Sequence, residues 1–116
     1  AAIAIRRAIG DRAYLTIDLS FLALALAEQR RAEEARAALA DCTTLLHEVG
    51  EGVEQVQLVH LNRALAHRAL GDSVEAAHAL AQAREVLDRL AAALPDAERA
   101  SFLAQRIPRR IVEEST

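Results

Sequence analysis

Residues 32–46 read AEEARAALADCTTLL, and residues 73–87 read SVEAAHALAQAREVL. The second stretch begins 41 positions after the first, and the two share small and apolar residues at the same places. The match extends outward over residues 10–50 and 51–91, with the coincident pairs Ala23/Ala64, Glu34/Glu75, Ala35/Ala76, Ala38/Ala79, Leu39/Leu80, Cys42/Ala83 and Leu46/Leu87. A repeat of this length with helical spacing predicts helix pairs that bury one another's faces.

The spacing of apolar residues predicts an all-α protein. Four long helices are expected over residues 12–28, 32–48, 53–70 and 73–93. Gly10-Asp11 is expected to end a helix over 1–9 and to begin the next one, because Gly suits a C-terminal cap and Asp an N-terminal cap. Pro95 is expected to begin a shorter helix over 97–106. Ile107-Pro108 is expected to break the chain again before a last turn of helix.

The composition favours one small helical domain without a strong charge. Of the 116 residues, 53% are apolar and 3% aromatic, so Ala and Leu must form most of the core. The net charge of −3 offers no basic field to nucleic acid or to an anionic membrane. Charges interrupt every apolar stretch before the ~20 residues that a membrane span needs. Cys42 is the only cysteine, which excludes an intrachain disulfide and favours a cytoplasmic location.

The turns between the helices resemble those of the tetratricopeptide repeat (TPR) family, in its longer, ~40-residue bacterial variety. The matching stretches are Arg30-Arg31-Ala32-Glu33-Glu34-Ala35 and Gly71-Asp72-Ser73-Val74-Glu75-Ala76, with a junction at Ala8-Ile9-Gly10-Asp11-Arg12. Pro95-Asp96, Ser101-Phe102-Leu103 and Pro108-Arg109-Arg110-Ile111 are similar to the segment that closes such arrays. The resemblance implies one TPR-like α-solenoid over 1–116: a half repeat at 1–9, repeats at 10–50 and 51–94, and a capping helix and tail at 95–116.

The resemblance also implies a partner-binding groove, since the first helix of each TPR pair lines the inner side of the array. Its residues here would be Ile17, Ser20, Leu24, Leu58, Leu61, Leu65 and Arg68. The apolar stripe would bury a helix or an extended peptide, and Arg68 would orient it. Alternatively, other repeats, or the capping helix around Phe102 and Leu103, already cover this stripe.

The second copy carries His60, Arg63 and His67 where the first has Leu19, Leu22 and Leu26. These three polar residues share one helix face. Either the helix is rotated relative to its counterpart in the first copy, or this face is solvent-exposed and contacts a partner. His60 and His67 stand two turns apart, roughly 10 Å, which is too far to share one metal ion. The sequence therefore predicts no metal site.

Other reactive residues fit structural roles. Cys42 aligns with Ala83 and is expected to be a small buried packing residue. No motif supplies a nucleophile with its base, or a glycine-rich phosphate loop, so we expect no catalytic residues, no enzyme activity and no cofactor. A small helical enzyme or metal protein is the least favoured class.

The sequence thus predicts a non-catalytic protein–protein interaction scaffold or sensor segment of a larger cytoplasmic bacterial signalling protein. Its partner would be a protein or peptide, or other domains of the parent chain, and neither nucleic acid nor membrane. The alternative is a structural homo-oligomerisation module, a homodimer formed through the N-terminal helix, which charges placed at Ile3 and Ile5 would weaken.

Overall fold

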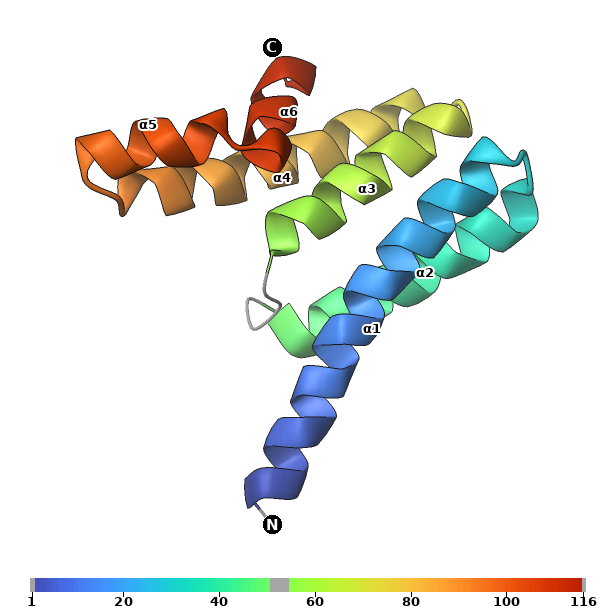
Figure 1. Ribbon diagram of the computed structural model, residues 1–116. Helices are drawn as coiled ribbons and strands as arrows, with labels where there is room; N and C mark the ends of the chain where they lie inside the picture. Colours follow the sequence, from blue (N-terminus) through green and yellow to red (C-terminus); the bar gives the residue numbers. More distant parts are fainter. Residues whose placement is uncertain (1, 51–54, 116) are drawn as a thin grey trace.

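The computed structural model describes the backbone of residues 2–50 and 55–115, and the side chains of 11–50 and 55–115. Over these residues the chain is all-α, which confirms the predicted fold class (Figure 1). The helices are α1 (Ala2–Glu28), α2 (Ala32–Val49), α3 (Val56–Ala69), α4 (Ser73–Ala92), α5 (Asp96–Ala104) and α6 (Arg106–Glu114).

The helices form three pairs that follow one another along the chain. α1 and α2 are the first pair, α3 and α4 the second pair, and the short helices α5 and α6 the closing pair (Figure 1). The first and second pairs pack against each other mainly through α1 and α3. α6 lies on α4, at the side of the second pair remote from the first.

The predicted helix break at Gly10-Asp11 is wrong, because α1 runs without interruption from Ala2 to Glu28. Glycine inside a helix costs only about 1 kcal/mol relative to alanine, and no proline lies nearby to block the backbone. A favourable pair of capping residues therefore does not end a helix by itself. Residues 2–9 belong to the same helix as 12–28.

The turns inside the two pairs have the same backbone geometry. In the first, Arg30 has φ 61° and the Arg31 amide donates to the Leu26 carbonyl at 2.9 Å. In the second, Gly71 has φ 81° and the Asp72 amide donates to the His67 carbonyl at 2.9 Å. Each bond spans five residues and satisfies a carbonyl at the helix end, as in a Schellman cap. The repeat thus extends to the backbone of the turns.

The core consists mainly of the residues that the two copies share. Its first cluster lies within the first pair and includes Ala66 of α3; its buried members are Ala23, Leu26, Ala27, Ala35, Ala38, Leu39 and Ala66. The second lies within the second pair and includes Ile111 of α6; its members are Leu61, Ala64, Ala79, Leu80, Ala83, Leu87 and Ile111. Cys42 and Val59 form a third, smaller cluster between the pairs. Small residues therefore stand where helices approach closely.

The boundary between α5 and α6 differs from the prediction. The chain turns at Gln105, whose ψ of 156° is extended, and Pro108 lies inside the first turn of α6. Proline fits there because the amides of a first helical turn have no partner within the helix. The predicted break at Ile107-Pro108 therefore falls three residues late. Arg99 of α5 donates to the Ala91 and Leu94 carbonyls at 2.8 and 2.9 Å, which satisfies the end of α4.

Candidate binding surfaces

Two of the seven predicted groove residues lie in the interior. Ser20 and Leu61 have exposed fractions of 0% and 1%. The Asn62 side-chain amide donates to Ser20 Oγ at 3.1 Å, and Ser20 Oγ donates to the Ile17 carbonyl at 2.7 Å. Leu61 packs in the second cluster. In this structure neither side chain offers surface to a partner.

Four other predicted groove residues are partly buried and keep some apolar surface: Ile17, Leu24, Leu58 and Leu65. They are two repeat-related pairs, since Leu58 follows Ile17 and Leu65 follows Leu24 by 41 residues. We call these four residues the half-buried row. It runs along α1 and α3, the first helices of the two pairs.

The last predicted groove residue, Arg68, is exposed and ion-paired with Glu114 of α6. The hydrogen bond that Arg68 donates to Glu114 is the largest cause that holds the pKa of Glu114 below its usual value, and the charges of Arg68 and Arg110 lower it further. Ile107 and Val112 of α6 pack against the same cluster as Leu65. The closing pair thus lies against part of the predicted groove.

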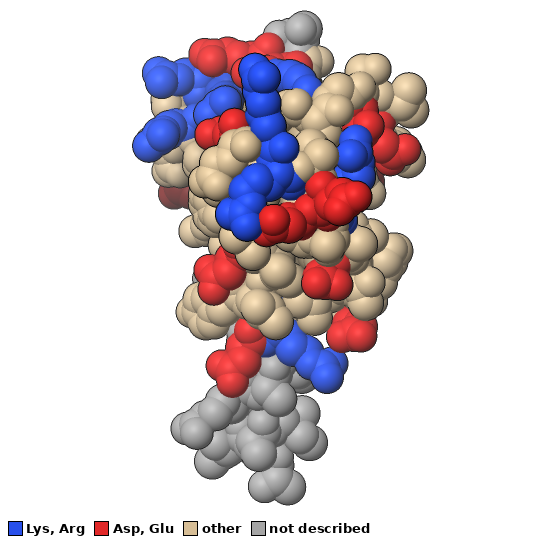
Figure 2. All heavy atoms as spheres, turned by 90° about the vertical axis from the view of Figure 1, so that its right-hand side faces the viewer, with Lys and Arg blue, Asp and Glu red and all other residues tan. Residues whose placement is uncertain are grey.

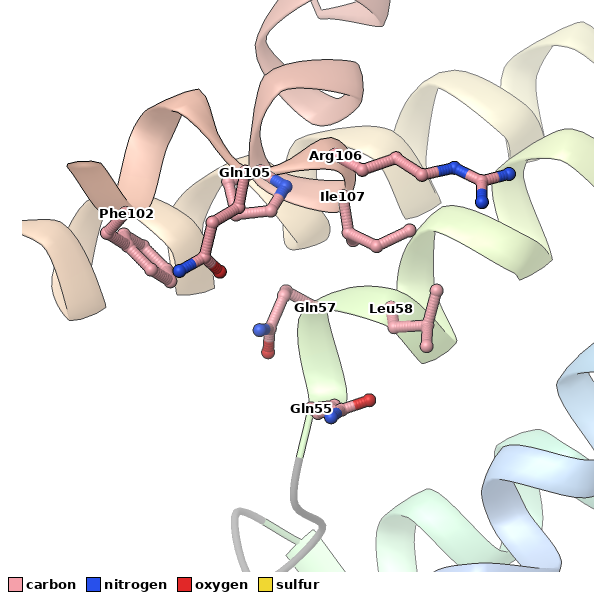
Figure 3. Close-up of a pocket in the computed structure, with 8 residues that line it drawn as sticks. Gln55, Gln57, Leu58, Phe102, Gln105, Arg106 and Ile107 are labelled. Carbon is pink, nitrogen blue, oxygen red and sulfur yellow. The ribbon is translucent and has the colours of Figure 1, made fainter. Parts of the chain in front are cut away.

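A cavity of about 280 Å³ opens where the row meets the closing pair (Figure 3). Leu58, Phe102, Ile107 and Pro108 supply its apolar lining, and its polar lining residues are Gln55, Gln57, Gln105 and Arg106. Figure 3 shows the Gln105 side chain beside Phe102, with Gln57 across the opening. Each amide can donate and accept hydrogen bonds, so the opening suits a peptide backbone next to an apolar side chain.

The second predicted surface, His60, Arg63 and His67, is partly buried. Arg63 lies 3.1 Å from His60 Nδ1 and donates to Gln82 Oε1 at 3.2 Å, whereas its Nε is buried without a partner. His67 Nδ1 lies 3.6 Å from Asp72 Oδ2. His60 and Arg63 line a second cavity of about 280 Å³ between α2, α3 and α4, and its other lining residues are Thr43, Leu46, His47, Gly50, Val56, Gln82, Val86 and Arg89.

Burial controls the protonation of these groups. It lowers the pKa of His60 to about 4, with a smaller contribution from the Arg63 charge, so the imidazole is neutral at pH 7. Burial also lowers the pKa of Arg63. The Cys42 thiol has its pKa raised to about 11 by burial, and it donates weakly to the Thr16 carbonyl at 3.6 Å. A protonated, buried thiol is a poor nucleophile.

Sequence reasoning missed two features. Asn62 is 3% exposed and bonds Ser20 across the two pairs, although its counterpart in the first copy is Phe21. The side of α1 that faces away from the second pair carries Tyr14, Leu15, Phe21 and Leu22, all exposed. The sequence could have indicated the second feature, because apolar residues occur on every side of α1, whereas a helix at the protein surface needs them only on the side that faces the core.

The part of the chain that the structure describes has neither a cluster of metal-binding side chains nor a helix that could span a membrane. No group of three His, Cys, Asp or Glu side chains there could hold a metal ion. Within the same residues, no helix is both long and apolar enough to cross a bilayer.

These features define an all-α protein with two equivalent antiparallel helix pairs and a shorter closing pair. No protein-family model, no curated protein and no solved structure matches the chain.

Proposed function

We propose that this chain is a non-catalytic module that binds a protein or peptide partner through the half-buried row and the adjoining cavity. The observation that carries the proposal is the row itself. Ile17 and Leu24 on α1 recur as Leu58 and Leu65 on α3, all with apolar surface left over after packing. Repetition spaces the exposed side chains regularly, which suits a helix or an extended peptide.

We further propose that the helix pairs form a short solenoid of the TPR type, within a larger cytoplasmic signalling or regulatory protein. The 41-residue repeat, the equivalent turns and the docking of α3 on the first pair support this arrangement. In such an array the first helices line one side, and the row lies on both first helices of this chain. The cavity at Leu58 and Phe102 would take an apolar side chain of the partner, and the glutamines at its rim would bond the partner's backbone.

A library of peptides displayed on phage tests the proposal. We expect wild-type protein and the Val74→Glu control to enrich the same peptides, because Val74 is 78% exposed on α4. Leu58→Glu should lose the enrichment by about tenfold or more, because it places a charge beside the cavity. Equal enrichment by all three proteins would exclude this surface. Amide shifts in NMR spectra should map each selected peptide to Leu58, Phe102 and Ile107.

The exposed apolar side of α1 gives a second candidate function, homo-oligomerisation, which the carboxylate of Asp18 on the same side opposes. Sedimentation velocity at micromolar concentration distinguishes the two functions. A concentration-dependent dimer that Leu22→Glu abolishes would favour self-association, and a monomer would count against it.

A further inference from the structure

The outer face of α1 carries most of the large apolar side chains that the described surface exposes. Tyr14 is 66% exposed, Leu15 and Phe21 are 48% exposed, and Leu22 is 49% exposed. Helical spacing places them around Asp18 and Ala25, and these six residues are here called the outer face. The opposite side of the helix is buried, and its members are Thr16, Ser20, Ala23 and Ala27. A helix that is apolar on all sides is typical of a buried position.

Asp18 is the one charged residue among the six of the outer face. Elsewhere the surface is unevenly charged, and Figure 2 shows charged side chains crowding the upper part of the molecule above a mainly uncharged band with separate carboxylates.

The internal repeat indicates what kind of structure covers such a face. A shift of 41 residues carries Asp18, Phe21 and Ala25 onto Val59, Asn62 and Ala66 of α3. Those three residues are 0%, 3% and 0% exposed.

Each of the three α3 residues contacts the first pair. Val59 packs with Cys42, Ala66 joins the cluster of Ala23 and Ala38, and Asn62 bonds Ser20. The part of the outer face around Asp18, Phe21 and Ala25 is therefore the same helix side, in the same register, that α3 uses to dock on a preceding helix pair, whereas the counterparts of Tyr14, Leu15 and Leu22 lie at the edge of that contact.

We propose that the outer face of α1 is a second docking surface, and that it binds an antiparallel helix pair of the same repeat type. The partner's contact side would carry small residues, as the first pair does at Ser20, Ala23, Ala27, Ala38 and Cys42. This surface lies apart from the half-buried row and does not depend on the function proposed for it.

The partner also has a required charge. Asp18 stands where α3 has the fully buried Val59, and it makes no ion pair with any described residue. Burying a lone carboxylate is costly unless an opposite charge meets it. A partner that fits this face therefore presents a basic side chain at the position that contacts Asp18.

A second copy of the chain fits this face poorly. Each helix pair of the chain has one side lined with small residues on which a following helix can pack. Both of these sides are already covered, that of the first pair by α3 and that of the second pair by Ile111 of α6. A second copy could offer only its own outer face. Antiparallel pairing centred on that face would bring Asp18 against Asp18 of the other copy, which is repulsive.

An extended chain provides the test, with the protein's own first pair as the probe. Residues 1–54 are followed by residues 14–116, which adds one helix pair in register and keeps the natural connecting segment. The internal copy of α1 then has a small-residue partner in front of its outer face. We expect one cooperative urea transition with a steeper dependence on urea than in the original chain. Asp18 limits the gain in midpoint, because the probe places Cys42 and not a basic side chain at that position.

Single substitutions show whether the face is docked. Phe21→Glu in the internal copy should lower the midpoint by about 1 M or more, because its α3 counterpart Asn62 is 3% exposed and the charge becomes buried. The same change in the original chain, where Phe21 is 48% exposed, should shift it by much less. Val74→Glu is the matched control and should be mild in both chains.

A second variant, Asp18→Val in the internal copy, covers the case in which the extended chain does not fold. It replaces the carboxylate with valine, the residue that α3 has at the equivalent position, Val59. It should raise the midpoint of the extended chain but not that of the original chain. Two results together would overturn the proposal. The added pair would melt separately, and Phe21→Glu would be equally mild in both chains even when combined with Asp18→Val. A dimer of the original chain that Leu22→Glu abolishes would also overturn it, because the occupant would then be a second copy.

Discussion

The outer face of α1 and the far side of the second pair are the opposite ends of the two repeated helix pairs, and among the described residues only the far side is covered. At the far side, Ile111 of α6 fills the space above Leu61 and Ala83 and is 0% exposed. At α1, Leu15 and Leu22 stay about half exposed. Because the repeats are alike in sequence, the difference comes from the closing pair. It teaches that α6 takes the place on the second pair that α3 takes on the first.

The largest expected effect tests the covered end. Ile111→Ala should lower the free energy of unfolding by about 2–4 kcal/mol, because it empties a fully buried site between α6 and the second pair. Leu22→Ala, at the open end, should cost less than about 1 kcal/mol. Urea unfolding followed by circular dichroism measures both. Similar losses for the two variants would mean that the ends do not differ as described.

The next effect concerns the contact between the pairs. Asn62→Ala should cost about 1–2 kcal/mol, because it removes the buried bond to Ser20. Ser20→Ala and the double variant complete a mutant cycle, in which we expect a coupling of about 0.5–1 kcal/mol. Additive losses would show that the bond does not join the pairs energetically.

A pH effect distinguishes the second pair from the first. The pKa of His60 is about 4 in the folded chain and near 6.5 when unfolded, so the unfolded state binds more protons between these values. Stability should therefore fall as pH drops from about 6.5 to about 4, by about 1–2 kcal/mol after allowance for partial solvent exposure. His60→Leu, which restores the residue type of Leu19, should flatten this dependence in urea titrations. Parallel pH profiles for the two proteins would rule out His60 as the cause.

The smallest effect compares the two turns. Arg30→Gly should raise stability by about 0.5–1 kcal/mol, because Arg30 has φ 61° where the second turn has glycine. Gly71→Ala should lower it by a similar amount, since no atom lies within 4 Å to clash and only the backbone conformation is strained. Thermal unfolding resolves both changes, and opposite signs to these would contradict the equivalence of the turns.

The repeat predicted most of the fold because its shared positions are packing positions. Ala23, Ala35 and Cys42 and their counterparts are all buried, and three of the four long helices, α2, α3 and α4, lie within a few residues of their expected bounds. Local signals failed at Gly10-Asp11 and at Pro108. A glycine tolerated within a helix and a proline in a first turn look like breaks in sequence, but both are compatible with helix.

The candidate surfaces were less predictable because they depend on which elements lie over them. Leu61 matches the expected groove pattern, yet it is buried in the cluster that Ile111 completes. His60 and Arg63 were expected on a rotated or a wet face, but they are partly buried between three helices and bond each other. Neither outcome follows from the sequence of α3 alone. The burial of Leu61 depends on Ile111, fifty positions further along the chain, and the burial of His60 and Arg63 depends on α2 and α4.

The buried bond between Asn62 and Ser20 has a consequence for exchanging helix pairs between such proteins. An alanine-lined contact accepts many neighbours, because small side chains carry little shape or direction. Asn62 makes the contact of the second pair selective, because its buried amide loses a hydrogen bond wherever no acceptor faces it. A graft that moves the second pair onto a foreign first pair should therefore carry Ser20 with it, or replace Asn62 at the same time.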